Sequence, residues 1–173
     1  MTGSALLPWS GFVLAAKPTL GGALFLAYPS RDKAISAGAL AATSFIVAPH
    51  WMPSWLNAIH KAPHYPLLLV PGGALLLLAL LRWRRPEGRL LAALSCIPGT
   101  GLAYEWVPLW LIPETRRQYL SLAVLTHLAF LPTVLGPPRG MPEATFLSWN
   151  AIIALFLVYF PMLWLVLRRR QGA

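Results

Sequence analysis

Charged residues are scarce in this sequence, and their scarcity excludes an ordinary soluble domain. Only 11% of the 173 residues are charged, whereas soluble domains carry about 25%. Hydrophobic residues make up 57%, and apolar runs separated by short loops recur along the whole chain. We therefore expect an all-α fold, a polytopic transmembrane helical bundle that forms a single membrane domain over residues 1–173.

Cysteine is nearly absent, since Cys96 is the sole one in the chain. A single thiol excludes an intrachain disulfide and a thiolate metal cluster, and the apolar run around it predicts a small buried side chain. The sequence also contains no phosphate-binding loop, no G-x-S-x-G motif and no H-E-x-x-H motif. It therefore predicts no cofactor and no metal site.

Acidic residues are also few, five against 14 lysines and arginines, and the formal net charge is +9. The excess does not predict nucleic acid binding, because no basic patch is interleaved with aromatic residues on a polar face. Arginine instead stands at the ends of apolar runs, where it sets the orientation of membrane proteins. Asp32, Glu87 and Glu114 fall among these arginines, and we expect them to form surface ion pairs worth under about 1 kcal/mol each.

Five apolar segments predict full membrane spans, which are residues 18–28, 34–48, 65–83, 119–135 and 144–167. Between the second and third spans, Trp51, Trp55 and Ile59 recur every four residues. This spacing predicts an interfacial helix within residues 50–64, lying along the membrane surface. Its histidines fit hydrogen bonds to water or to a lipid phosphate better than they fit a zinc site.

The centre of the chain, residues 90–113, is apolar but broken by the tetrapeptide PGTG at 98–101. If this stretch crosses the membrane twice, eleven Lys and Arg residues face the cytoplasm and three face outward; if it crosses once, the counts are seven and seven. Positive loops favour the cytoplasmic side, so we expect the stretch to fold back. Its two halves are too short to span the bilayer, which predicts two central half-helices, an outward-facing cavity at their break and a cytoplasmic C-terminus.

Glu105 lies within this central stretch, and a carboxylate at membrane depth is costly unless it is paired, protonated or hydrated. Two interpretations are open. Glu105 either ties the half-helices together or lines the cavity with Tyr104 and Thr100. In the later span, His127 is expected to form a hydrogen bond to another helix. The eight tryptophans are expected to form belts at the two membrane surfaces.

A second group of candidate residues lies at the predicted outward surface. Lys17 precedes a proline that begins a helix, and it acts either as a topology anchor or as a ligand of a lipid phosphate. We group it with His60, Lys61 and His64 as candidate lipid-phosphate-binding residues.

Four motifs carry a family resemblance: LAAKPTLGGALFL, PHWMPSW, LLRWRRPEGRLLAAL and IPGTGLAYEWVPLWLIPETRRQ. With them the chain resembles, over roughly residues 8–135, the C-terminal half of polyprenyl-phosphate-dependent glycosyltransferases of the GT-C architecture, especially the family 87 type of bacterial mannosyltransferases. The resemblance implies a bacterial inner membrane and a polyprenyl-phosphate sugar attacked at the outer face. It also implies an aspartate base in an early outward loop. The only aspartate here, Asp32, is expected to face inward, so the chain resembles a truncated member that is not catalytic alone.

Two functions of different classes follow, and both place the chain among membrane lipids. The first is a glycosyltransferase-like integral membrane protein with an outward-facing cavity for a polyprenyl phosphate or another anionic lipid. The alternative is a non-enzymatic structural or assembly subunit that packs against a partner membrane subunit. A transporter fits less well, because no inverted repeat is visible.

Overall fold

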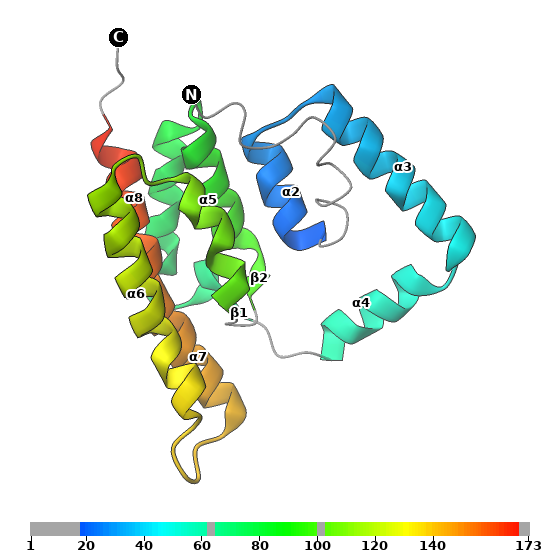
Figure 1. Ribbon diagram of the computed structural model, residues 1–173. Helices are drawn as coiled ribbons and strands as arrows, with labels where there is room; N and C mark the ends of the chain where they lie inside the picture. Colours follow the sequence, from blue (N-terminus) through cyan, green and yellow to red (C-terminus); the bar gives the residue numbers. More distant parts are fainter. Residues whose placement is uncertain (1–17, 62–64, 100–102, 170–173) are drawn as a thin grey trace. The chain divides into compact units, whose positions relative to one another are not determined.

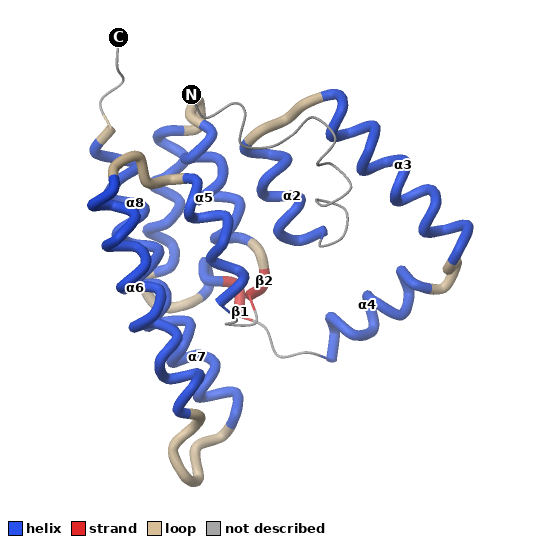
Figure 2. Tube along the Cα trace, in the orientation of Figure 1, coloured by secondary structure: helices blue, strands red, loops and turns tan. Residues whose placement is uncertain are grey.

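A computed structural model describes residues 18–61, 65–99 and 103–169 (Figure 1). The chain divides into two compact units, Met1–Pro63 and His64–Ala173. The described residues are largely helical, and the one strand pair joins β1 (Tyr65–Pro66) to β2 (Pro98–Gly99) in antiparallel fashion (Figure 2). The prediction of a largely helical fold is therefore confirmed.

The first unit contains three helices: α2 (Pro18–Ala27), α3 (Arg31–Val47) and α4 (Trp51–Lys61). Ser30 caps α3, because its hydroxyl accepts a hydrogen bond from the Lys33 amide at 3.2 Å. The Lys33 side chain is 6% exposed, and its Nζ donates to the Tyr28 carbonyl at 3.2 Å. These two bonds fix the turn between α2 and α3.

Helix α4 leaves α3 at an angle of 101°. Trp51 and Trp55 are half-buried, and their ring centroids lie 6.4 Å apart with the ring planes tilted by 54°. In contrast, Asn57 and His60 are exposed. The predicted amphipathic helix at this position is thus present. Its location on a membrane surface stays a prediction.

In the second unit, consecutive helical segments run in opposite directions and pack side by side (Figures 1 and 2). The segments are η2 (Leu67–Leu69), η3 (Gly73–Arg82), α5 (Pro86–Cys96), η4 (Ala103–Leu111), α6 (Arg116–Leu135) and the continuous helix formed by α7 (Glu143–Ala154), η5 (Leu155–Tyr159) and α8 (Phe160–Arg168). The segments η2, η3 and η4 are 3₁₀ helices, and η5 is a single π-helical turn. The fully buried leucines Leu76, Leu90, Leu91, Leu109, Leu122 and Leu155 form much of the core.

Local sequence explains where the helices of this unit begin and end. Pro86 occupies the first turn of α5, where a missing amide donor costs nothing. Thr115 and Gln118 form a reciprocal capping box at the start of α6. At its other end α6 stops at Gly136, whose φ of 75° is accessible mainly to glycine.

Two helices, Arg116–Leu135 and Glu143–Arg168, are long and apolar enough to cross a membrane. At 1.5 Å per residue they reach about 30 Å and about 39 Å, which covers a hydrocarbon layer of about 30 Å. A third span exists only if the bent pair of α3 and α4 is counted as one. The described residues therefore provide two or three candidate spans, and the predicted five are not confirmed.

The expected span over residues 65–83 differs most from the structure. Pro71 and Gly72 interrupt it, since Gly72 takes a φ of 86°. The helical part is thereby divided into the three residues of η2 and the ten residues of η3. Ten residues in a 3₁₀ helix rise about 20 Å, which is less than the hydrocarbon thickness. Segment η3 is therefore too short to be a full span.

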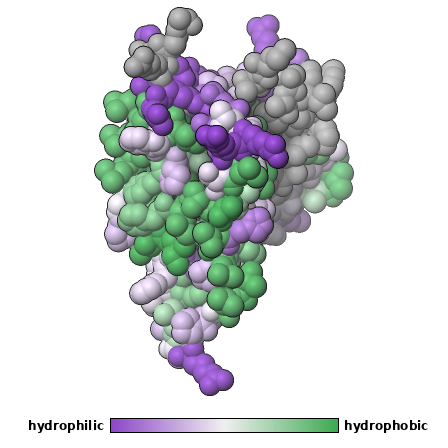
Figure 3. Space-filling view, turned by 60° about the vertical axis from the view of Figure 1, so that its left-hand side comes forward, coloured by the Kyte–Doolittle hydropathy of each residue, from purple (hydrophilic) through white to green (hydrophobic). Residues whose placement is uncertain are grey.

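The face of the second unit that is visible in Figure 3 separates into zones. Hydrophilic residues gather at the two ends, and hydrophobic residues cover the surface between them. Exposed arginines mark one end, namely Arg84, Arg116, Arg117 and Arg168, and Arg139 with Glu143 marks the turn at the other. An apolar band between two charged ends is the pattern expected of a protein embedded in a bilayer.

Candidate functional site

The central stretch of the chain forms a hairpin in which α5 and η4 lie side by side. Both ends of this hairpin meet at Arg169. Its Nη1 lies 3.1 Å from Oε1 of Glu87, in the first turn of α5, and its Nη2 lies 3.2 Å from Oε1 of Glu114, which follows η4. The same guanidinium donates to the Ile112 carbonyl. Both arms of the hairpin therefore end at the same end of the bundle, whereas the side of a membrane that this end faces stays a prediction.

Arg169 and Glu87 also correct one expectation. Glu87 was predicted to be a surface ion-pair partner, but its side chain is only 12% exposed and that of Arg169 only 11%. Glu114 is a surface ion-pair partner as predicted, since its side chain is 61% exposed. An ion pair that is largely withdrawn from water is strongly destabilised when one partner is removed.

The tip of the hairpin contains the predicted break. β2, which includes Pro98 and Gly99, pairs with β1, so that Tyr65 lies opposite Gly99. Thr100, one of the three predicted cavity residues, lies outside the described residues. Cys96, at the end of α5, is exposed rather than buried as expected, because α5 ends there and the core lies on its other face.

The two other predicted cavity residues, Tyr104 and Glu105, lie at the start of η4. Tyr104 is 44% exposed, and Glu105 is half-buried. The Glu105 carboxylate interacts electrostatically with Tyr159, which is 3% exposed and belongs to the π-helical turn η5. Such turns occur often at functional sites. Pro161 follows η5 and withholds the amide that the Leu157 carbonyl would otherwise accept, which accounts for the irregular turn.

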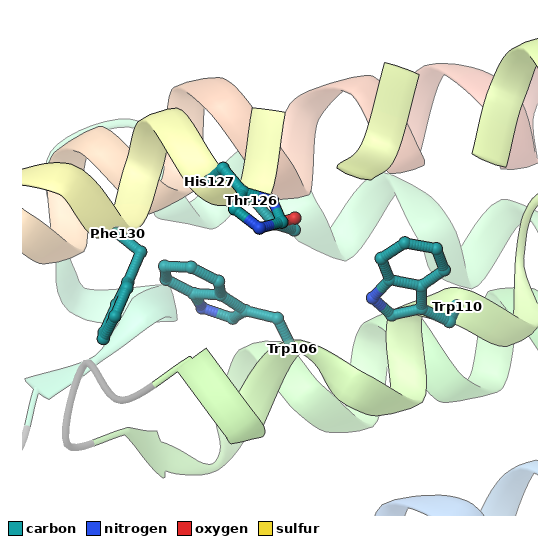
Figure 4. Close-up of a pocket in the computed structure, with 5 residues that line it drawn as sticks. All are labelled: Trp106, Trp110, Thr126, His127 and Phe130. Carbon is teal, nitrogen blue, oxygen red and sulfur yellow. The ribbon is translucent and has the colours of Figure 1, made fainter. Parts of the chain in front are cut away.

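A groove lies between η4 and α6 (Figure 4). It has a volume of about 120 Å³ and is lined by Trp106, Trp110, Thr126, His127 and Phe130. Trp106 is buried and meets Phe130 edge to face, with ring centroids 6.5 Å apart. Trp110 is 36% exposed and stacks on Tyr119 at 6.2 Å. In Figure 4 the side chains of Thr126 and His127 point toward the gap between the two indole rings.

Sequence reasoning did not find this groove. The tryptophans were assigned to surface belts, and His127 was expected to bond to another helix. Instead, its Nδ1 lies 2.7 Å from the Ala123 carbonyl of its own helix. The signal was present in the spacing, because Trp106 and Trp110 are four residues apart and His127 and Phe130 are three apart.

Of the predicted lipid-phosphate-binding residues, only His60 has a described side chain. It is exposed on α4, and its Nδ1 lies 2.8 Å from the Leu56 carbonyl. Lys17 and His64 lie outside the described residues, as does the side chain of Lys61. A site shared by these four residues therefore stays a prediction.

Among the described residues, no group of three or more His, Cys, Asp or Glu side chains is arranged to hold a metal ion. Comparisons of the chain with protein-family models, with curated proteins and with solved structures found no match. The resemblance to the GT-C glycosyltransferases therefore stays a prediction.

Proposed function

We propose that this chain is a glycosyltransferase-like integral membrane protein that binds a polyprenyl phosphate or a related anionic lipid and is not catalytic alone. In this proposal it resides in a bacterial inner membrane with its C-terminus in the cytoplasm. The arginine-rich end, which includes Arg169, then faces inward, as positive residues do in most membrane proteins.

The observation that carries the proposal is the short hairpin closed by Arg169. Eleven residues of α5 rise about 16 Å from the arginine-rich end, so the turn lies about midway through a hydrocarbon layer of about 30 Å. Broken backbone at that depth must be buried in protein or line a polar cavity. Glu105 lies beside this turn, which supports a polar site that opens toward the outer surface.

Lys17, His60, Lys61 and His64 supply the phosphate-binding groups in this proposal. A lysine ammonium or a protonated imidazole forms charge-assisted hydrogen bonds with phosphate oxygens. His60 fits this role, since it is exposed and its Nδ1 is used by its own helix, which leaves Nε2 available. The lipid chain then lies among the apolar helices.

Binding of farnesyl phosphate and farnesol to the full chain in nanodiscs tests the proposal. We expect the parent chain to bind the phosphate at least tenfold more tightly than the alcohol. Lys17→Ala should lower the ratio of the two affinities about tenfold, since one charged hydrogen bond contributes roughly 1.5–3 kcal/mol. The matched control is Arg139→Ala, which removes the same charge from an exposed turn. Equal binding of phosphate and alcohol by the parent chain would refute the proposal.

The alternative, a structural or assembly subunit, is favoured by the surface of α6. Only 17% of its apolar window is buried within the chain, and Leu120, Val124, Leu128 and Leu131 are exposed. Such a helix packs either against lipid or against helices of a partner subunit. Native mass spectrometry of the protein extracted from its own membrane distinguishes the two. A lipid-loaded monomer supports the first function, and a stoichiometric complex with a second protein supports the alternative.

A further inference from the structure

The groove between η4 and α6 combines three features that together specify a ligand. Its lining is largely aromatic, because Trp106, Trp110 and Phe130 border it and Phe130 meets Trp106 edge to face. Its volume of about 120 Å³ is close to the space of one six-membered ring, since an apolar cavity of about 150 Å³ holds benzene. Aromatic faces attract other aromatic rings in stacked or edge-to-face geometry.

The second feature is a hydrogen-bond acceptor that the protein leaves unused. A carbonyl oxygen accepts only, so the short distance between His127 Nδ1 and the Ala123 carbonyl places the proton of the neutral imidazole on Nδ1. His127 Nε2 then carries a free lone pair. Thr126 donates its hydroxyl proton to the carbonyls of Leu122 and Ala123, both at 2.9 Å, so its oxygen also presents only lone pairs.

The third feature is a donor on the opposite side. In Figure 4 the indole nitrogen of Trp110 lies on the side of its ring that borders the gap, and an indole N–H donates only. The groove thus offers a donor from η4 and acceptors from α6. A hydroxyl group matches this pair, because it donates one hydrogen bond and accepts another.

The position of the groove along α6 indicates the class of ligand. His127 lies about 17 Å along α6 from its start at Arg116, near the middle of a hydrocarbon layer of about 30 Å. A ligand at this depth must be membrane-soluble. We propose that the groove binds the hydroxylated aromatic ring of a membrane-soluble phenol or quinol, whose hydroxyl donates to His127 Nε2 and accepts from Trp110 Nε1–H.

This site is separate from the proposed phosphate site, because no cation lines it and a phosphate is not part of the ligand. Its loss would leave farnesyl phosphate binding intact. The failure of either proposal is therefore visible without the other.

The test uses two probes that differ by one methyl group, 4-hexylphenol and 4-hexylanisole. The methyl ether still accepts from Trp110, but it has no proton to give to His127. The full chain, labelled with ¹⁵N-tryptophan, is placed in nanodiscs, and the indole N–H signal of Trp110 is followed by NMR during titration. Its assignment comes from the signal lost in Trp110→Phe.

We expect the Trp110 signal to shift to saturation with 4-hexylphenol and to require about five- to tenfold more 4-hexylanisole, as the loss of one hydrogen bond implies. His127→Leu should reduce the phenol affinity to that of the ether. The Trp164 signal is the internal control, since that residue is 64% exposed on α8 and does not line the groove. Equal affinity for both probes in the parent chain would overturn the proposal. A shift that grows linearly without saturation would also overturn it, because it reports partitioning into the bilayer only.

Discussion

Glu87 and Glu114 stand at opposite ends of the central apolar stretch, yet both bind the guanidinium group of Arg169, at 3.1 and 3.2 Å. This arrangement requires the stretch to leave the arginine-rich end of the bundle and to return to it. It also ties the end of α8 to both arms of the hairpin. The end of the bundle at which α6 begins follows from this return.

Replacing Arg169 should destabilise the fold more than any change to a neighbouring arginine. Arg169→Ala removes the ion-pair partner of Glu87, whose side chain is only 12% exposed, and we expect a loss of about 3 kcal/mol in the free energy of unfolding. The midpoint of thermal unfolding in a fixed detergent measures the effect. Arg168→Ala is the matched control, because Arg168 is exposed and should change stability little. A smaller effect for Arg169→Ala than for Arg168→Ala would contradict the role given to this residue.

The two glutamates should differ in the same assay. Glu87→Gln removes a charge that is 12% exposed, whereas Glu114→Gln removes one that is 61% exposed. Water screens the second pair, so its loss should cost under about 1 kcal/mol. We expect the larger drop in unfolding midpoint for Glu87→Gln, and the opposite order would show that the buried pair does not hold the hairpin.

Two glycines should not tolerate alanine, because backbone of a neighbouring turn occupies the space. A Cβ at Gly88 would lie 2.4 Å from the Arg82 carbonyl oxygen, and one at Gly73 would lie within bonding distance of the Leu67 carbonyl oxygen. Both changes should lower the yield of folded protein in gel filtration. In contrast, Gly22→Ala meets nothing within 4 Å in α2 and should leave the yield unchanged or raise it.

Asn150 should be replaceable by leucine at little cost. It is 5% exposed, its Nδ2 donates to Thr133 Oγ1 at 3.3 Å, and its Oδ1 is buried without a hydrogen-bond partner. Asn150→Leu removes a hydrogen bond worth about 0.6 kcal/mol and also removes the unpaired acceptor. Thr133→Val leaves the whole amide unpaired and should lower the unfolding midpoint more. If Asn150→Leu is the more damaging change, a ligand or water is inferred to satisfy Oδ1.

Strong local signals in the sequence predicted the parts of the fold that formed as expected. The proline and glycine at 98 and 99 located the break, and the uninterrupted apolar runs before Gly136 and Arg168 located the two long helices. Charge asymmetry predicted the return of the chain, because it sums over all loops. The predicted full span over residues 65–83 is not confirmed, because the hydropathy of a segment does not reveal that Pro71 and Gly72 interrupt its helix.

The candidate site was less accessible from sequence, because its geometry depends on contacts between distant segments. The burial of Glu87 depends on Arg169, and the groove needs η4 to place Trp106 and Trp110 opposite His127. The spacing within η4 and within α6 groups the lining residues of each segment, but it does not show that the two segments lie opposite each other. Glu105 was recognised because a carboxylate in an apolar run is unusual wherever it folds.

Cysteine labelling tests the return of the chain most directly. In a Cys96→Ser background, single cysteines replace Arg84, Arg117 and Arg139, all of which are exposed. A membrane-impermeant maleimide is then applied to sealed vesicles of known orientation. The account predicts that positions 84 and 117 react from the same side and position 139 from the other. Labelling of positions 84 and 117 from opposite sides would contradict it.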